Sequence, residues 1–547
     1  MEQNKFRMVA KTFEGLEDVL RDELIELGAE NVELGKRMVS FEGDLETLYK
    51  ANLCCRTALR ILKPIVMFNA TSPDELYDYL RDLDWEQFMD ADSTFSVDST
   101  VYSEGFTHSK FVTYRVKDAI VDHFRDKNGA RPSIRLESPD IRFNVHIAGD
   151  RVTVSLDSSG EPLYKRGYRV EQTDAPINEV LAAGIILKTG WRGDSDLLDP
   201  MCGSGTFLIE AALIAANINP GIYRESFAFE KWKDFDKELF EDLYNDDSEE
   251  KDFNYKIFGG DIDPDAVAKA KKNIKSARVE EMIDIRCCPL TDWEADTAEG
   301  VIVTNPPYGE RLRPANLSNL YKDIGSTLKN NFQGWHAWII GYQDEQMKEI
   351  GLKPSVKIPL FNGNLECSLR EYVMFDGSYS QFRADGGSVA SEASEKKKSE
   401  GPRKVRHISD DEWKKDSRKF NRDNGIKEKP HGHSKGRSDN RERTKNKRDR
   451  EDFNLRNEGG GDSPKKYFKD RKFDKFGDKK KSDRFGDNRK PDRFGDNRKP
   501  DKFKERDRDF KKSGPEYNPA NSKGPRLSKE SEKVINPVHI RKRKGNA

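Results

Sequence analysis

The segment that most constrains the fold of this chain is an apolar strand that ends in a proline-rich loop. Residues 301–304 read Val-Ile-Val-Thr, a mainly β-branched run typical of a strand buried inside a sheet. Asn305-Pro306-Pro307-Tyr308 follows at once, and its prolines fix φ and carry no N–H, so the loop is rigid. Open α/β sheets bind ligands at the carboxyl ends of their strands. The segment therefore predicts an α/β sheet with a ligand-binding loop at 305–308.

The chemistry of this loop suits a planar amine. The Asn305 side-chain oxygen and the Pro306 carbonyl can accept its two N–H groups, and the Tyr308 ring can stack on its flat face. An ordinary proline turn explains Asn-Pro alone, but it explains these four residues in this order less well. We therefore predict Asn305, Pro306, Pro307 and Tyr308 as the catalytic loop.

A second motif, Asp-Pro-Met-Cys-Gly-Ser-Gly-Thr at 199–206, joins a short apolar strand to an Ala-, Leu- and Ile-rich helix. This is the pattern of the first βα unit of a doubly wound sheet. Gly203 and Gly205 allow a ligand to approach the backbone closely. The dinucleotide fingerprint is incomplete, because its third glycine would fall at Leu208. A cofactor with a ribose and no phosphates fits better, and S-adenosylmethionine is the candidate.

Aspartates at the ends of successive predicted strands complete the cofactor site. Asp261 would accept the ribose hydroxyls, Asp199 would attract the ammonium group, and Asp292 would take the adenine amine. Any one of them alone is more often a helix cap or a turn residue, so the prediction depends on their order along the strands. The predicted cofactor residues are Asp199, Pro200, Cys202, Gly203, Gly205, Thr206, Asp261, Asp292 and Asn305.

These motifs, with Tyr164–Arg169 and Pro176–Ala183, resemble the THUMP-domain class I RNA guanine-N2 methyltransferases, and among them the RlmL half of the bacterial 23S rRNA enzyme. Residues 116–122 and 139–145 are similar to the end of a THUMP domain, and 362–367 to the closing hairpin of the catalytic domain. The resemblance covers about the first 380 residues. A second methyltransferase does not follow, because neither the glycine loop nor the Pro-Pro loop recurs.

The resemblance implies an α/β, Rossmann-like class I methyltransferase domain preceded by ferredoxin-like and THUMP α+β domains. Four connector residues are expected to contact RNA, namely Lys165, Arg166, Tyr168 and Arg169. An insertion at 217–253 mixes aromatic and acidic residues and receives no predicted role. The expected boundaries are a ferredoxin-like lobe at 1–60, a THUMP domain at 61–157, a connector at 158–175, the methyltransferase domain at 176–380 and a tail at 381–547.

The near-neutral chain has two parts of opposite charge. Residues 391–547 hold 51 Lys and Arg against 30 Asp and Glu, a net charge of +21, which leaves residues 1–390 at −22. The tail has few Leu, Ile and Val residues, so we expect it to be disordered. A nine-residue repeat places Phe476, Phe485, Phe494 and Phe503 among basic residues. These rings are predicted to stack on RNA bases, although a solubilising tail without a ligand explains the composition nearly as well.

Other features exclude several classes of protein. The six cysteines form no C-x-x-C pair, so we expect reduced cysteines and no metal site. No apolar run approaches the roughly 20 residues of a membrane span, and the first residues lack an apolar signal segment. We therefore expect a cytoplasmic protein without a membrane partner. No feature of the sequence predicts its oligomeric state.

The expected reaction is methyl transfer from S-adenosylmethionine to the exocyclic N2 of a guanosine, with 23S rRNA as the first candidate substrate. A tRNA guanine-N2 or an adenine-N6 methyltransferase would use the same loop. A third alternative is an RNA-binding or ribosome assembly factor, which the intact glycines, Asn305 and Tyr308 disfavour. In each enzymatic alternative the target base must flip out of the RNA helix to reach the loop.

Overall fold

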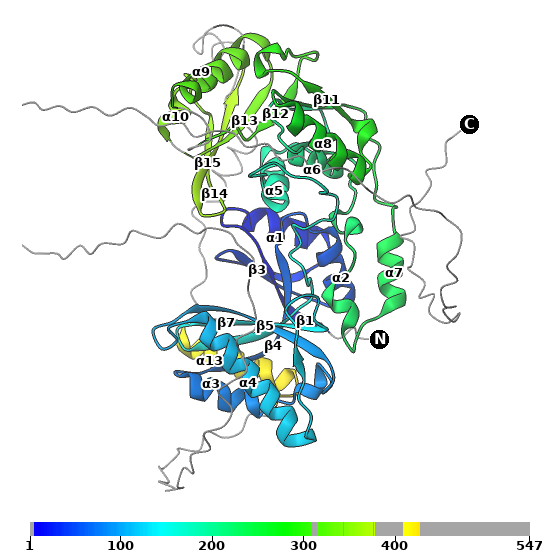
Figure 1. The fold of residues 1–547 in the computed structure, drawn as a ribbon, viewed down its shortest axis with the longest axis vertical. Coiled ribbons are helices and arrows are strands. Elements are labelled where there is room, and N and C mark those ends of the chain that lie inside the picture. The colour runs from blue at the N-terminus through cyan, green and yellow to red at the C-terminus, as the bar shows by residue number, and fades with distance from the viewer. Residues whose placement is uncertain (1–4, 309–313, 343, 376, 378–408, 427–547) are drawn as a thin grey trace, which may run out of the picture. The chain divides into compact units, whose positions relative to one another are not determined.

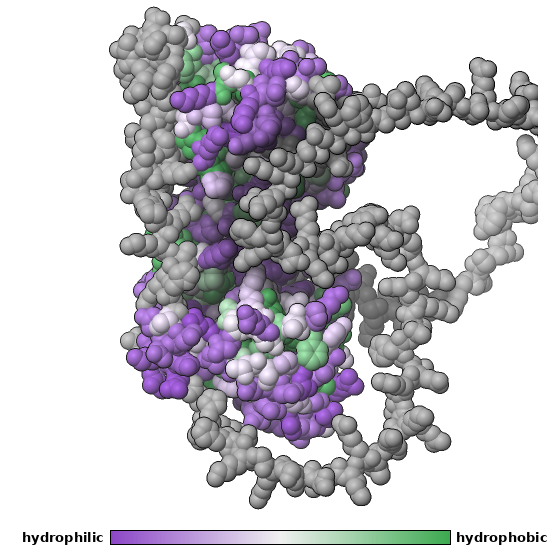
Figure 2. All heavy atoms as spheres, turned by 90° about the vertical axis from the view of Figure 1, so that its left-hand side faces the viewer, coloured by the Kyte–Doolittle hydropathy of each residue, from purple (hydrophilic) through white to green (hydrophobic). Residues whose placement is uncertain are grey.

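The computed structural model describes residues 5–308, 314–342, 344–375, 377 and 409–426 (Figure 1). All of them belong to one unit, Met1–Arg437. No described helix combines the length and the apolar character that crossing a membrane requires. The face drawn in Figure 2 is largely hydrophilic where it is described, because the large apolar side chains lie in three buried clusters.

The first 157 residues build one eight-stranded sheet with the order β2-β3-β1-β4-β8-β7-β5-β6. Helices α1 to α4 accompany it (Figure 1). Burial alternates along β7, where every second residue from Ile141 to Ile147 is buried, whereas β4 is buried along most of its length. The predicted ferredoxin-like and THUMP folds are confirmed, but they share strand β4. The strands are β1 Phe6–Lys11, β2 Glu30–Gly35, β3 Met38–Gly43, β4 Arg60–Asn69, β5 Thr94–Tyr102, β6 Ser133–Ile134, β7 Ile141–Ala148 and β8 Arg151–Asp157, and the helices are α1 Glu17–Glu26, α2 Leu45–Cys54, α3 Pro73–Arg81 and α4 Ser109–Asn128.

A second sheet, ordered β11-β10-β9-β12-β13-β15-β14, forms the Rossmann-like domain. Strands β11 to β13 in this order run parallel, and β15 is antiparallel to β13. Helix α6 is buried along its whole length, as its apolar sequence predicts. The strands are β9 Asp196–Asp199, β10 Ile257–Asp261, β11 Ile283–Cys287, β12 Gly300–Thr304, β13 His336–Gly341, β14 Val356–Asn362 and β15 Leu365–Val373, and the helices are α5 Glu179–Thr189, α6 Thr206–Ala215, α8 Pro264–Ala277, α9 Pro314–Asn331 and α10 Asp344–Lys348.

The insertion after α6 packs against the N-terminal sheet and its helices. It contains helix α7, Lys237–Asn245, and a cluster of aromatic rings around Tyr49 of α2. The ring of Phe229 stacks on Tyr49 with 4.5 Å between centroids, and Phe240 meets both rings edge-on. The aromatic residues that carried no predicted role therefore join the catalytic domain to the first 157 residues.

One described segment contradicts the predicted disorder of 381–547. Residues Asp410–Asp423 form helix α13, which packs on β4. The low average hydrophobicity of the tail concealed a short amphipathic segment in which Trp413, Phe420 and Asn421 recur at helical spacing. The repeat residues Phe476, Phe485, Phe494 and Phe503 lie outside the described part of the chain.

Candidate functional site

Three parallel strands of the second sheet bring the predicted loops to one edge. Asp199 ends β9, Asp261 ends β10 and Thr304 ends β12. The registers place Gly259 opposite Asp199 and Ile302 opposite Leu198, so these strand ends lie side by side. The glycine loop after β9 and the Asn-Pro-Pro-Tyr loop after β12 consequently start from neighbouring strands, at the edge where such sheets bind ligands.

The glycine loop is held in place by the aspartate predicted to bind the ribose. The backbone N–H of Gly203 donates to Oδ2 of Asp261 at 2.9 Å, and Oδ1 of Asp261 accepts from the Asp263 N–H at 2.9 Å. Each carboxylate oxygen has a second lone pair, so Asp261 keeps acceptor capacity for hydroxyl groups. Gly205 has φ +84°, and a Cβ there would lie 3.2 Å from the Ala270 Cβ. A side chain at Gly205 would therefore strain the loop and crowd helix α8.

Asp199 is buried between the two loops. Its Oδ1 accepts from the Thr304 hydroxyl at 2.8 Å and from the Met201 N–H at 3.2 Å. Burial raises the pKa of Asp199 to about 7, against the lowering effect of these two hydrogen bonds. A buried carboxyl with this pKa is ready to ionise when a cation binds beside it. That behaviour suits the predicted contact with an ammonium group.

The Asn-Pro-Pro-Tyr loop contains an unsatisfied acceptor. Oδ1 of Asn305 is buried and has no hydrogen-bond partner among the described residues. Buried amide oxygens are nearly always bonded, so this atom is positioned for a donor that a ligand would supply. Tyr308 is almost fully buried, and its hydroxyl accepts from the Asn362 side chain, which lies at the end of β14. This bond fixes the ring that is predicted to stack on the base.

Other predicted cofactor residues lie on the same loops with different exposure. Cys202 is buried, its N–H donates to the Gly260 carbonyl at 2.7 Å, and burial raises the pKa of its thiol well above the usual range. It therefore remains a neutral thiol. Asp292 is exposed in the turn after β11, where its carboxylate accepts from Thr291. Its predicted contact with the adenine amine stays a prediction.

Two of the four predicted RNA contacts are inconsistent with the structure. Arg166 and Tyr168 are buried, and both contact Glu210 of the apolar helix α6. The Tyr168 hydroxyl donates to Glu210 at 2.8 Å, and the Arg166 guanidinium also donates to the Arg56 carbonyl. Burial and internal partners make them links between the N-terminal lobe and the catalytic domain, not surface contacts. Lys165 is exposed and pairs with Glu161 at 2.6 Å, and its contact with RNA stays a prediction.

Arg169 fixes the glycine loop, a function that the sequence did not predict, and its contact with RNA stays a prediction. Its Nη1 donates to the Ser204 hydroxyl and its Nη2 to the Thr206 hydroxyl, both at 2.9 Å. Its Nε donates to Glu179, the first residue of α5, at 2.7 Å. The guanidinium therefore joins the connector, α5 and both sides of Gly205.

Sequence reasoning also missed Asn273 of α8, which is fully buried. Its Oδ1 accepts from the N–H groups of Val170 and Glu171, and its Nδ2 donates to the carbonyls of Glu171 and Ser204. This one side chain ties the connector to the glycine loop. The signal that could have found it, and Glu210 as well, is a polar residue on the apolar face of a helix.

A cluster of possible metal ligands on the THUMP part already contains a cationic side chain. Ligand atoms of Asp84, Glu86 and His123 lie within 4.8 Å of one another. Lys127 approaches Glu86 at 2.9 Å and Asp84 at 3.5 Å, and His123 pairs with Glu86 at 2.9 Å. A lysine already supplies the cation, so we assign these residues to an ion-pair network between α4 and the segment before β5.

Comparison with known proteins gives three domain matches. The chain matches the RMKL-like methyltransferase domain over residues 166–371, the THUMP domain over 70–157 and the RlmL ferredoxin-like domain over 7–62. It is 37% identical over 364 residues to a protein of Synechocystis named as an RNA methyltransferase, and the match covers 66% of this chain and 95% of that one. The chain belongs to the RMKL-like methyltransferase family. The comparison thus agrees with the family that the motifs indicated.

Two further matches support the assignment. The ribosomal RNA large subunit methyltransferase K/L of Syntrophotalea carbinolica is 41% identical over 372 residues, which is 65% of this chain and 52% of that protein. The chain thus spans about half the length of the curated K/L relatives that it matches. The crystal structure of the methyltransferase SMU.472 complexed with SAH is 31% identical and superimposes with a TM-score of 0.62, over 69% of this chain and all of that one.

Proposed function

We propose that this protein is an S-adenosylmethionine-dependent RNA methyltransferase that modifies the exocyclic N2 of a guanosine. The observation that carries the proposal is the buried Oδ1 of Asn305, which has no partner in the described part of the chain and lies one strand away from the glycine loop. Bound S-adenosylmethionine supplies an electrophilic methyl group. The structure of SMU.472 with SAH, the name of the Synechocystis protein and the family match support the cofactor and the RNA substrate.

The residues at the strand ends fit this cofactor. Asp261 keeps acceptor capacity for the ribose hydroxyls after binding Gly203, and Asp199 ionises beside an ammonium group. The positive φ of Gly203 and Gly205 lets the backbone approach the ligand without side chains. Arg169 and Asn273 hold the loop in this conformation before the cofactor binds.

The catalytic loop acts on the shape of the acceptor nitrogen. The amine of guanine is a weak nucleophile because its lone pair is delocalised into the ring. Hydrogen bonds from its two N–H groups to Asn305 Oδ1 and the Pro306 carbonyl favour a pyramidal nitrogen that points at the methyl carbon. Tyr308 stacks on the base, which must first leave its helix. After transfer the acidic N–H proton of the product passes to solvent, and no general base is needed.

Ribosomal RNA is the preferred substrate class, because the K/L relatives carry that name. The same loop would also hold a guanine of tRNA or the N6 amine of adenine. The test is nucleoside mass spectrometry of separated rRNA and tRNA from a strain that lacks the protein. We expect N2-methylguanosine to fall in rRNA alone and to return with the wild-type gene but not with Asp261→Ala. Loss confined to tRNA or to N6-methyladenosine would contradict the proposed substrate.

A further inference from the structure

Helix α13 packs on strand β4 with one face. Trp413, Asp416, Ser417, Phe420 and Asn421 are partly or fully buried and recur at helical spacing, and the remaining residues of the helix are exposed. Ser409 and Glu412 form a capping box at its first turn. The helix therefore has a defined start and a defined buried face, although it follows the catalytic domain in sequence.

Asn421 makes the most specific contact of this helix. Strand β1 pairs with β4 only over Arg60–Leu62, so the next part of that edge has no strand partner among the described residues. There the Met67 N–H donates to Asn421 Oδ1 at 3.0 Å, and Asn421 Nδ2 donates to the Met67 carbonyl at 2.7 Å. The fully buried carboxamide thus satisfies both backbone groups of one residue, as a neighbouring strand would.

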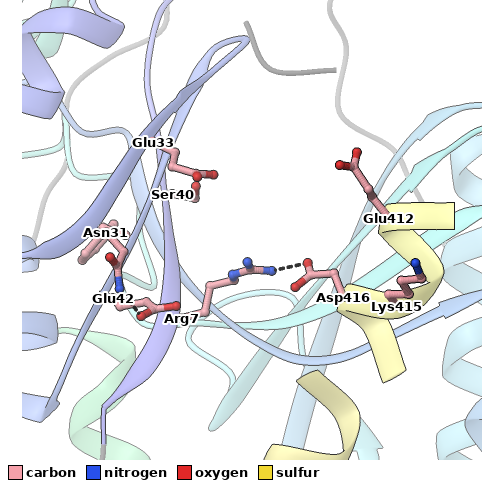
Figure 3. Close-up of a pocket in the computed structure, with 9 residues that line it drawn as sticks. Arg7, Asn31, Glu33, Ser40, Glu42, Glu412, Lys415 and Asp416 are labelled. Atoms are coloured by element: carbon pink, nitrogen blue, oxygen red, sulfur yellow. Dashed lines mark hydrogen bonds and ion pairs between the residues drawn. The ribbon is translucent and has the colours of Figure 1, made fainter. Parts of the chain in front are cut away.

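Charged contacts to two other strands fix the orientation of α13. Arg7 of β1 donates to Asp416 at 2.8 Å across the pocket drawn in Figure 3. Arg151 of β8 pairs with Asp410, and its guanidinium lies 5.6 Å from the centre of the Trp413 ring. The helix consequently spans β1, β4 and β8, the strands at which the ferredoxin-like lobe and the THUMP domain meet.

We propose that the sheet carrying the THUMP domain contacts the substrate RNA and that α13 anchors the basic C-terminal segment on this sheet. The segment at 427–547 follows α13 directly and holds 40 Lys and Arg against 22 Asp and Glu, a net charge of +18. Anchored in this way, it begins at the THUMP-bearing sheet instead of at the end of β15. Its partner is the phosphate backbone of the RNA that the sheet binds, so this inference rests on the proposed RNA substrate.

The anchor raises the effective concentration of the basic segment at RNA held by the sheet. Charge alone offers a competing explanation, because a basic tail and an acidic body attract each other without a fixed contact. The two explanations predict a different dependence of the contact between α13 and the sheet on salt concentration. Hydrogen bonds of Asn421 and burial of Trp413 and Phe420 persist at 1 M salt, where the screening length falls to about 3 Å, and loose charge attraction does not.

The first test is hydrogen exchange of the full chain at 0.1 M and 1 M NaCl. Trp413→Ala with Asn421→Ala removes the buried contacts, and Lys419→Ala with Asp423→Ala changes two exposed residues of the same helix without changing its net charge. We expect protection of 410–423 at both salt concentrations in the wild type and the control variant, and at least tenfold faster exchange in the docking variant. Equal exchange in all three proteins, or protection in the wild type that disappears at 1 M NaCl, would overturn the anchor.

The second test measures affinity for protein-free ribosomal RNA without cofactor. We expect the docking variant to bind about tenfold more weakly than the control with the same slope of log affinity against log salt, since the basic segment still meets phosphates. Truncation after residue 426 should weaken binding and flatten the slope. A docking variant that binds as tightly as the control, or a truncated chain with unchanged affinity, would overturn the role in RNA binding. Neither test uses methyl transfer, so a failure of the proposed enzymatic function would be seen separately.

Discussion

At the scale of single residues, the site is defined by side chains that, within the described residues, lack a hydrogen-bond donor or a cationic partner until a ligand binds. Asn305 has a buried acceptor that no described residue bonds, and Asp199 has a carboxyl whose pKa burial raises to about 7. Both states cost free energy in the isolated protein. A bound amine and a bound ammonium group would relieve them, so both groups should show large and measurable responses to substitution or pH.

Asn305→Ala should lower kcat by about 100-fold or more, because the acceptor that shapes the target amine is lost. The far-ultraviolet circular dichroism spectrum should change little, and saturating cofactor separates the loss of kcat from any loss of cofactor affinity through Asn305. Tritiated-methyl transfer at saturating RNA and S-adenosylmethionine measures the loss. Tyr308→Phe is the matched variant, since it keeps the ring and removes the bond from Asn362, and most activity should remain. Full turnover by Asn305→Ala would exclude the loop from the mechanism.

The affinity for S-adenosylmethionine should depend on pH through Asp199. Below pH 7 the carboxyl of the free protein is protonated, and it must release that proton to pair with the ammonium group. Affinity should therefore rise several-fold from pH 6 to about pH 7.4 and fall again at higher pH, because α-amino groups lose their proton with a pKa of about 7.7–8.0. Calorimetry in buffers of different ionisation enthalpy would detect the released proton. Asp199→Asn should abolish the release, and pH-independent binding by the wild type would contradict this role.

The sequence predicted the position correctly for residues whose place in the fold follows from the apolar pattern beside them. Asp199, Asp261 and Asn305 each end an apolar run, and strand ends of a parallel sheet meet at one edge. Arg166 and Tyr168 were assigned wrongly because their environment depends on Glu210, which is more than 40 residues away. No local pattern distinguishes an arginine that faces solvent from one that pairs inside a domain interface.

At the scale of elements, the glycine loop depends on a connector that lies outside it. Arg169 bonds the two hydroxyl residues that flank Gly205, and Asn273 bonds the Ser204 carbonyl from the opposite side. The loop thus has rigid support from the connector and from α8. This support explains how a glycine-rich segment can keep one conformation while presenting bare backbone to a ligand.

Arg169→Ala should weaken S-adenosylmethionine binding about tenfold or more, while kcat at saturating cofactor changes much less. Arg169→Lys should recover little, since one ammonium cannot reproduce the planar fork that reaches Ser204, Thr206 and Glu179 together. Isothermal calorimetry and a KM-against-kcat comparison measure the two effects. The exposed Lys165→Ala is the control and should leave cofactor affinity unchanged. Equal affinity in Arg169→Ala and wild type would contradict the positioning role.

Helices and strands were predicted correctly where apolar residues recur regularly. The prediction failed where few apolar residues lie among many polar ones. The strands around the two loops were expected from their apolar runs, and the hairpin β14–β15 was expected from the family resemblance of residues 362–367. Helix α13 was missed because its few buried residues lie in a segment of very polar composition. Its fold depends on an external surface, the Met67 edge of β4, and an average over the tail carries no information about that surface.

At the scale of the whole molecule, the insertion after α6 determines how strongly the catalytic domain is joined to the first 157 residues. Phe229 is fully buried among Tyr49, Phe227 and Phe240. Phe229→Ala should lower the free energy of unfolding by about 3–5 kcal/mol through the cavity that it leaves. Urea denaturation followed by circular dichroism measures the change. Tyr255→Ala removes an exposed ring and should cost far less, and equal midpoints for the two variants would contradict the packing role.

Strand β4 contains the boundary between two domains, which bears on how they are inherited. The ferredoxin-like match ends at residue 62 and the THUMP match begins at 70, so the seam between two recognised modules falls inside one ten-residue strand. Its amino-terminal end pairs with β1, and most of its length pairs with β8. Neither module can be excised without removing a pairing partner from the other. We expect the two modules to unfold as a single cooperative block and to be inherited together, as one heritable unit.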